Sequence, residues 1–154
     1  MTTILTTNKL KEITAISNAV DVNNLLPFIS IAELFHVKPI LGDELFEEIV
    51  LGIEDNNLSA DLTKLVNTYV IPTSAFYTWY EAAPHLWLKT EAKGVVKKFS
   101  DNSSSIEGND FKIYRQSIYD KAIHYSNLLR KEVQKKDECR VKTANQTGFF
   151  LNFR

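Results

Sequence analysis

Three histidines and one cysteine are the side chains of this sequence best suited to bind a metal ion or to attack a substrate. His36, His85 and His124 stand far apart, and none belongs to a Cys/His cluster with the spacing of a metal site. Cys139 lies in a charged stretch without a nearby histidine, and the sequence has no Gly-x-Ser-x-Gly nucleophile elbow. We therefore expect surface or half-buried histidines, a cysteine without a catalytic role, and neither a metal nor a cofactor.

Paired carboxylates and glycine-rich loops, the other common signs of an enzyme, give no better support. Glu47-Glu48 and Glu54-Asp55 are adjacent acids, but neighbouring residues of a helix point in different directions, which favours a solvated face. The five glycines are scattered and form neither a Walker loop nor a dinucleotide fingerprint. The sequence therefore predicts a protein that is not an enzyme, with an active site shared between subunits as the alternative.

Nucleic-acid binding is the stronger competing interpretation, because basic residues gather in two places. Lys93, Lys97 and Lys98 flank Phe99, and residues 130–142 hold six basic against three acidic side chains. Such clusters meet phosphates readily. Against this interpretation stand the sequence pI of about 6.3 and the lack of a helix-turn-helix pattern. A small helical DNA-binding or regulatory protein therefore stays open as the alternative function.

Length and composition indicate one globular domain. The chain has 154 residues, of which 44% are hydrophobic and 24% charged, as in ordinary globular proteins. The first residues lack the basic and apolar regions of a signal peptide, and no apolar run approaches the about 20 residues that span a bilayer. The single cysteine excludes an internal disulfide and favours a reducing compartment. We expect no membrane association.

The formal net charge of −1 hides two halves of opposite sign. Residues 1–62 hold three Lys/Arg against ten Asp/Glu, and residues 63–154 hold fifteen against nine, which gives −7 and +6. Chance distribution over a solvated surface is one explanation. The other is a dipolar subunit that docks side by side or head to tail with its copies, since complementary potentials steer association.

Apolar residues recur at helical spacing along most of the chain and predict an all-α fold, a small bundle of about four to five helices. The first long helix, 21–38, is apolar around so much of its girth that we expect it to be buried between partners. Gly42 is placed to close it after Pro39, because glycine tolerates a positive φ. The other expected helices are 44–53, one that begins after Ser59 and is interrupted at Pro72 and Pro84, and 110–135, which has the strongest periodicity.

Residues 93–109 are the least regular stretch and are interpreted as a loop or short arm between the last two helices. The side chains of this stretch that we expect to contact a neighbouring subunit or a channel are Lys93, Val95, Lys97, Lys98 and Phe99.

Residues 137–154 lack helical periodicity and are interpreted as an extended C-terminal arm beyond a helical domain of residues 1–136. The last residues are too apolar for a tail surrounded by water, and exposed apolar patches usually mark binding sites. They comprise Phe149, Phe150, Leu151 and Phe153, followed by Arg154. Either this arm folds back onto its own core or it inserts into a neighbour.

Two stretches of the first helices, residues 25–33 and 37–46, resemble the opening helix pair of phage head–tail connector proteins. The pattern Ile29-x-x-Ala32 and the Leu41-Gly42 turn carry that match. Further segments are similar to uncharacterised connector-like proteins of phages that infect Bacteroidetes, including crAss-like phages. These segments are Pro84–Trp87, Lys93–Asn102 and Ala122–Leu129, and the resemblance as a whole covers residues 21–135.

The resemblance implies a virion structural protein of the head–tail junction, made in the host bacterial cytoplasm. Such adaptor subunits are helical bundles that form a ring, usually dodecameric, beneath the portal protein. The ring extends the DNA channel without sequence-specific binding and seats the next connector ring or the tail. In several of these proteins a C-terminal arm reaches into the portal, a role that residues 149–154 would fill here. A stopper or tail-terminator ring is disfavoured, because those rings are typically rich in β-strands.

Overall fold

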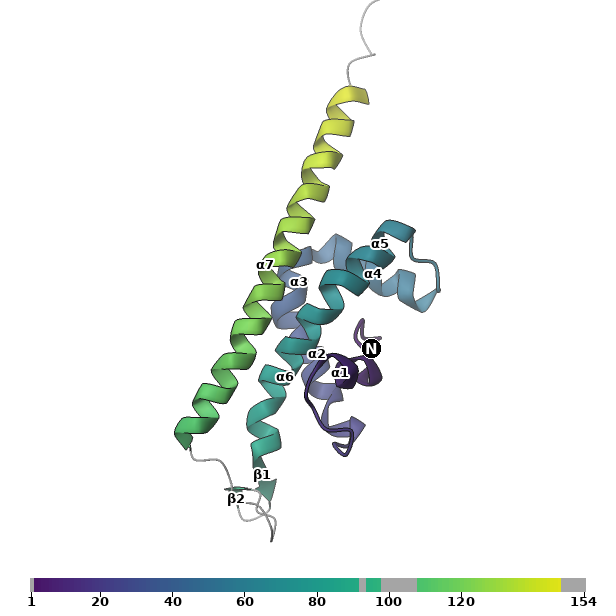
Figure 1. Cartoon of the computed structure of the whole chain (residues 1–154). Helices are drawn as coiled ribbons and strands as arrows, with labels where there is room; N and C mark the ends of the chain where they lie inside the picture. Colours follow the sequence, from purple (N-terminus) through teal and green to yellow (C-terminus); the bar gives the residue numbers. More distant parts are fainter. Residues whose placement is uncertain (1, 92–93, 98–107, 148–154) are drawn as a thin grey trace, which may run out of the picture.

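The computed structural model describes residues 2–91, 94–97 and 108–147 (Figure 1). The elements in chain order are α1 (Thr7–Ile13), η1 (Val22–Asn24), α2 (Leu26–Ala32), η2 (Glu33–Val37), α3 (Lys38–Leu41), α4 (Asp43–Glu54), α5 (Ala60–Leu65), η3 (Val66–Val70), α6 (Ile71–Trp87), β1 (Leu88–Glu91), β2 (Gly94–Lys97) and α7 (Gly108–Thr147). The elements α2, η2 and α3 form one continuous helix, and so do α5, η3 and α6. The predicted small all-α fold is thereby confirmed, with one short hairpin added to it.

The helices are arranged around α6, which packs on α7 on one side and on α2 on the other. Figure 1 shows α7 running along α6, while α4 and α5 lie on the side of α6 away from α7. Gly42 separates α3 from α4 with a φ of +79°, the positive sign expected of this glycine, while its ψ of 162° lies outside the left-handed helical region that was predicted. The result is a bundle whose two outermost surfaces are α7 and the α4–α5 pair.

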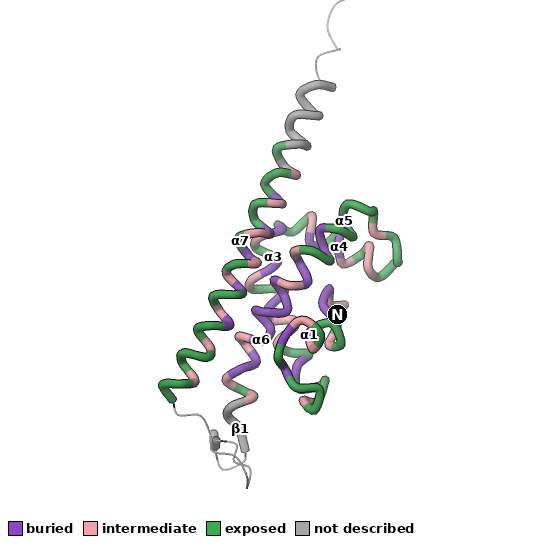
Figure 2. The backbone as a smooth tube through the Cα atoms, viewed as in Figure 1, coloured by how far each residue is buried: buried purple, intermediate pink, exposed green. Residues whose placement is uncertain are grey.

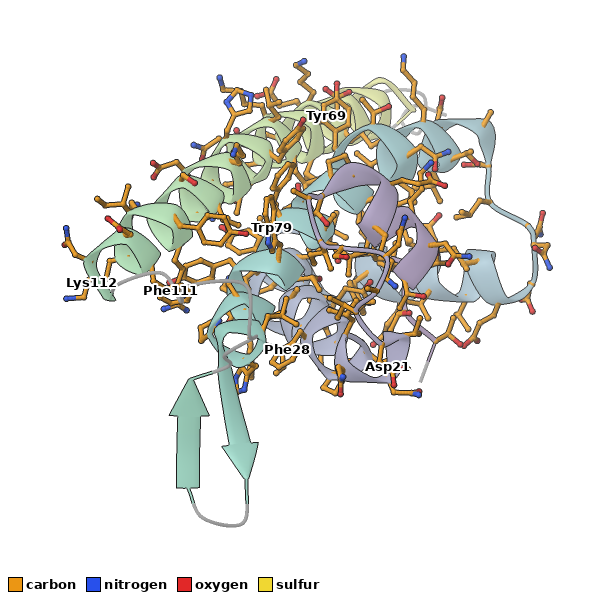
Figure 3. All side chains as sticks on the ribbon, turned by 60° about the horizontal axis from the view of Figure 1, so that its bottom comes forward. Asp21, Phe28, Tyr69, Trp79, Phe111 and Lys112 are labelled. Carbon is orange, nitrogen blue, oxygen red and sulfur yellow. The ribbon has the colours of Figure 1, made fainter. Side chains whose placement is uncertain are left out.

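The core fills the spaces between α6 and its neighbours (Figure 2). Buried apolar residues of α7 recur at helical spacing, as the sequence predicted, and they are Ile118, Ala122, Leu129 and Val133. Figure 3 shows Trp79 between α6 and α7. Its ring meets that of Tyr114 edge-on, with 6.0 Å between the ring centroids, a geometry that aromatic pairs favour. The seam between α6 and α7 therefore combines aromatic and aliphatic side chains.

Two of the prolines inside continuous helices follow a π turn. Pro39 stands two residues after η2, and Pro72 stands two residues after η3. In each case the amide just before the proline donates to the carbonyl five residues earlier. The wider turn gives the ring room beside the carbonyl that it would meet in a regular α-helix. Pro72 was expected to kink the helix or to restart it, and the helix does not restart there. The first long helix likewise continues through Pro39 to Leu41.

Pro84 was also expected to break a helix, but α6 continues through it to Trp87. A proline has no N–H, so the carbonyl of Tyr80 loses its usual helical partner. The Arg115 Nε donates to that carbonyl at 3.4 Å, and the guanidinium lies over the Tyr80 ring, 4.0 Å from its centroid. The neighbouring helix thus supplies the hydrogen bond that the proline removes.

Part of the segment predicted as irregular is a strand. β1 and β2 pair antiparallel, with Leu88 opposite Lys97 and Glu91 opposite Gly94. The β-branched pair Val95-Val96 favours the extended conformation of β2. Residues 108 and 109 already belong to α7.

The extended arm predicted from residue 137 was wrong as far as Thr147, because α7 continues to that residue. No glycine or proline occurs between Asn109 and Thr147, so nothing in this stretch removes a backbone donor or loosens the helix. An apolar stripe reports packing against a partner, and a helix can propagate without one. The predicted domain boundary at residue 137 therefore falls inside a helix.

Candidate assembly interface

The helix formed by α2, η2 and α3 is covered by its own chain on one face. Ile29, Ala32 and Val37 are fully buried in the core that this helix shares with α6. On the outer face Phe35 is 71% exposed, and Leu34 is exposed beside it. The sequence predicted that this helix is buried between partners, and within one chain that holds for the inner face alone. Exposed apolar faces are where proteins commonly bind partners, so this face is a candidate binding surface.

A groove of about 400 Å³ opens between η2 and α4 next to this face. We call it the α4 groove, and its lining residues are Thr2, Leu34, Lys38, Phe46, Glu47, Val50, Leu51 and Glu54. Phe46 is buried, while Leu51 is 57% exposed on α4. The exposed acids Glu47 and Glu54 complete the lining, so the groove combines an apolar interior with negative charge.

The single lysine of the α4 groove has partners within its own chain. Lys38 Nζ lies 3.1 Å from Asp43 Oδ1 and 5.6 Å from the centroid of the Phe46 ring. Since α4 carries five acids and no lysine or arginine, the charge presented around the groove is negative. A ligand for this surface therefore needs apolar side chains and a positive charge.

The inner side of η2 differs from the α4 groove, because its carboxylate, Glu33, is buried and not exposed to solvent. Glu33 is 3% exposed, and its Oε1 accepts a hydrogen bond of 2.8 Å from the backbone N–H of Leu5. Burial raises the pKa of Glu33 to about 7, against the lowering effect of the hydrogen bond from Leu5. This contact ties the N-terminal segment to the helix, and Thr2 of that segment lines the α4 groove.

His36 and Glu81 are the histidine and carboxylate that the structure brings together. His36 Nε2 lies 2.8 Å from Glu81 Oε1, and both side chains are half-buried. The imidazole stacks flat on the Tyr77 ring, with 4.0 Å between centroids and 1° between planes. One ring nitrogen is thus engaged and one ring face covered, so the pair links η2 to α6. His85 and His124 are exposed, and all three histidines have the surface or half-buried setting that the sequence predicted.

The far end of α7 runs beyond the body of the bundle (Figure 1). Val133 is a buried core residue, and the helix continues for the fourteen residues 134–147, which we call the α7 projection. At about 1.5 Å per residue the projection is about 21 Å long. Residues 130–147 carry six basic and three acidic side chains, so this end of the helix is positive. The α7 projection and the α4 groove lie on different sides of the molecule.

A second hollow lies at the start of α7 and has a basic, aromatic lining. It measures about 590 Å³, and its lining residues are Tyr80, Gly108, Phe111, Lys112, Arg115 and Gln116. The Arg115 guanidinium is engaged with Tyr80 as described above. Phe111 and Lys112 lie at this end of the helix in Figure 3. This hollow is the part of the described surface that best fits the alternative of nucleic-acid binding.

The residues that the sequence singled out as contacts fall mostly outside the described part of the chain. Phe149, Phe150, Leu151, Phe153 and Arg154 lie there, as do Lys93, Lys98 and Phe99. Val95 and Lys97 belong to β2. The α4 groove itself was not predicted, because the first long helix was expected to be buried between partners. The signal that pointed to it was the apolar girth of the first long helix, which exceeds what one neighbouring helix can cover.

Among residues 2–91, 94–97 and 108–147, no three His, Cys, Asp or Glu side chains come together as they would to hold a metal ion. One helix, Val22–Leu41, is long and apolar enough to cross a membrane by length and composition alone. Glu33, His36 and Lys38 interrupt the apolar run of this helix. Core helices often pass this test, and the buried side of this one packs on α6.

Residues 37–140 match a protein family that is described as a family of unknown function, DUF6712. The match includes α4 and most of the α4 groove, the whole of α6, and α7 as far as residue 140. Neither the curated proteins nor the solved structures contain a match to the chain.

Proposed function

The chain belongs to this DUF6712 family, and we propose that it is a virion structural protein, an adaptor subunit of a phage head–tail connector. Its copies form a ring beneath the portal protein, extend the DNA channel, and seat the next connector ring or the tail. The protein is made in the host bacterial cytoplasm and ends at the head–tail junction of the virion. DNA passes through the ring without sequence-specific contacts, and no enzymatic step is involved.

The observation that carries this proposal is the pairing of an uncovered apolar, acidic face with a basic helix end on another side of the same chain. Phe35 and the α4 groove present apolar surface and negative charge, and the α7 projection presents positive charge. Two different and complementary surfaces on one subunit produce head-to-tail contacts, which close into a ring when the rotation allows it.

The resemblance of residues 21–135 to connector proteins supplies the biological setting. A ring subunit needs a stable bundle, two lateral faces and a contact to the portal. The bundle around α6 meets the first requirement, since its core joins all the long helices. The face with the α4 groove and the α7 projection would meet the second. The apolar residues 149–153 are suited to a contact with a neighbouring protein, because large aromatic side chains carry most interface energy.

Light scattering of the purified full-length chain, with negative-stain images of the same sample, tests this proposal. Each measurement is made on the protein alone and after mixing with the portal protein of the same phage. We expect rings, or a monomer that assembles when the portal is added. A monomer that stays monomeric and does not bind the portal would contradict the proposal.

DNA binding is the second candidate, and the exposed basic residues of α7 favour it. Arg130, Lys131 and Lys135 are exposed, and Lys112 lies in the basic hollow at the other end of the helix. A shift of duplex DNA at micromolar protein that weakens steeply with salt would support this function. Binding that Lys131→Ala and Lys135→Ala together do not weaken would speak against it.

A further inference from the structure

We propose that the α4 groove binds the apolar segment Phe149–Phe153 from a second copy of this chain. This inference rests on the proposed function and deepens it, because it names the partner of the uncovered face. The contact is head-to-tail, with the groove of one copy holding the segment of the next.

The chemistry of the groove and of the segment is complementary. The groove offers apolar walls from Leu34, Val50 and Leu51. The segment has three phenylalanines and one leucine within five residues, and Arg154 follows it. A groove of about 400 Å³ has the size of sites that enclose small, mostly apolar ligands, so it can hold only a few large side chains at once. The segment therefore supplies the occupant that this surface lacks in a single chain.

Charge favours the same pairing and sets its direction. Glu47 and Glu54 line the groove, and no basic residue of α4 balances them. The segment follows the α7 projection, where basic residues outnumber acidic ones, and Arg154 adds a further positive charge. Opposite potentials steer association and disfavour other arrangements, such as groove against groove. The acidic half of one copy thus meets the basic half of the next.

The length of the chain excludes its own groove as the receptor. Phe153 lies six residues beyond Thr147, so these two residues can be at most about 22 Å apart. Returning along the α7 projection to the level of Val133 already takes about 21 Å. The chain would then still have to cross the helix that contains α6, which is about 10 Å wide, to reach α4. The segment of one copy can therefore fill only the groove of another.

The experiment uses the full-length chain and three single variants. Leu51→Glu places a charge in the groove, and Phe150→Asp places one in the segment. Ile113→Glu is the matched control, because Ile113 is an apolar side chain that is 63% exposed at the start of α7. Mass is followed by light scattering, and circular dichroism confirms that each variant keeps its helices. Leu34→Glu replaces Leu51→Glu if the latter loses helicity.

We expect the wild type and Ile113→Glu to assemble alike, while Leu51→Glu and Phe150→Asp assemble at least about tenfold more weakly. An equimolar mixture of these two weak variants should stop at a dimer. Each such pair retains one intact groove and one intact segment, which allows a single contact. Wild-type assembly by folded Leu51→Glu, or a mixture that stays monomeric, would overturn the inference.

A labelled peptide of residues 143–154 decides the question if the wild-type chain is monomeric in isolation. The peptide should bind the wild type and Ile113→Glu, and bind Leu51→Glu at least about tenfold more weakly. Failure to bind, or equal binding to Leu51→Glu, would overturn the inference. Ring formation on the portal is read separately. If Leu51→Glu still forms that ring, the proposed function stands and this inference fails. If the peptide binds the wild type but the wild type does not bind the portal, this inference stands and the proposed function fails.

Discussion

The two sides of the helix Leu26–Leu41 differ in how completely their side chains are covered by the same chain. Toward α6, apolar residues are fully buried, and even the carboxylate of Glu33 has a hydrogen-bond donor. On the outer surface of the same helix Phe35 is exposed, and an apolar groove between this helix and α4 is left open. Folding alone explains the first side, because its apolar residues are buried within one chain. The proposed assembly would cover the second side, and variants on the two sides should therefore affect different measurements.

The largest effect is expected on the closed side, at the seam between α6 and α7. Leu129 is fully buried there, so Leu129→Ala removes apolar contacts and leaves a cavity. The free energy of unfolding should fall by about 2–5 kcal/mol, as measured by denaturant titration. Ile113→Ala on the exposed face of the same helix is the control, with a change within about 0.5 kcal/mol. Equal losses of unfolding free energy at Leu129 and Ile113 would contradict the distinction between the buried and the exposed side.

The pH dependence of stability should report the buried carboxylate. The folded-state pKa of Glu33, about 7, lies above its ordinary value of 4.5, so the folded protein holds this proton more tightly than the unfolded chain. The contribution of this proton to the free energy of unfolding is full below about pH 4.5 and is lost as the pH rises through about 7. The total change is about 3 kcal/mol.

Glu33→Gln isolates this contribution from those of the other carboxylates. Glutamine keeps an acceptor for the Leu5 N–H but does not titrate. The stability of the wild type relative to Glu33→Gln should therefore fall between pH 5 and 8. Parallel stability curves for the two proteins would show that Glu33 does not titrate in this range.

A smaller effect is expected where Arg115 replaces the hydrogen bond that Pro84 removes from Tyr80. Arg115→Ala should cost about 1–2 kcal/mol of unfolding free energy, since a charged donor and its contact with the ring are lost together. In a Pro84→Ala background the Tyr80 carbonyl regains a helical N–H, and the same substitution should cost clearly less. A double-mutant cycle measures this coupling. Identical losses of unfolding free energy in both backgrounds would mean that the hydrogen bond from Arg115 to the Tyr80 carbonyl does not contribute to stability.

The smallest effect on folding is expected on the open side. Phe35→Ser and Leu51→Ser replace exposed side chains, so the unfolding free energy should change by no more than about 0.5 kcal/mol. The same variants should assemble more weakly in light scattering, because they remove apolar contact from the proposed interface. A large loss of stability without a change in assembly would place these residues in the core and overturn the comparison.

The sequence predicted well those parts of the fold where packing leaves a periodic signal. Ile118, Ala122 and Leu129 recur at helical spacing and are buried in the structure. Ser59 caps α5 as expected, accepting a hydrogen bond from the Leu62 amide. Features of this kind depend on residues that are close in sequence, so they can be predicted without knowing the rest of the fold.

Errors arose where the deciding partner was distant in sequence. Pro84 is tolerated because of Arg115, thirty-one residues away, and Pro72 because of a turn type that has no simple sequence signature. The helix beyond residue 136 carries no apolar stripe, so the hydrophobic periodicity gave no sign of it. The α4 groove was missed for a related reason. The apolar girth of the helix indicated a partner, but whether the partner is the same chain depends on the tertiary arrangement.

The two π turns have a consequence for the evolution of this family. A π turn contains one residue more than an α turn, so it absorbs an inserted residue that would rotate the rest of a regular α-helix by about 100° around the helix axis. The turn at Val66–Val70 lies within the matched residues 37–140, two residues before Pro72. A family member without a proline at this position needs no such turn. Its sequence should then align with a one-residue gap near residues 66–70, while the apolar positions of α6 stay in register on both sides.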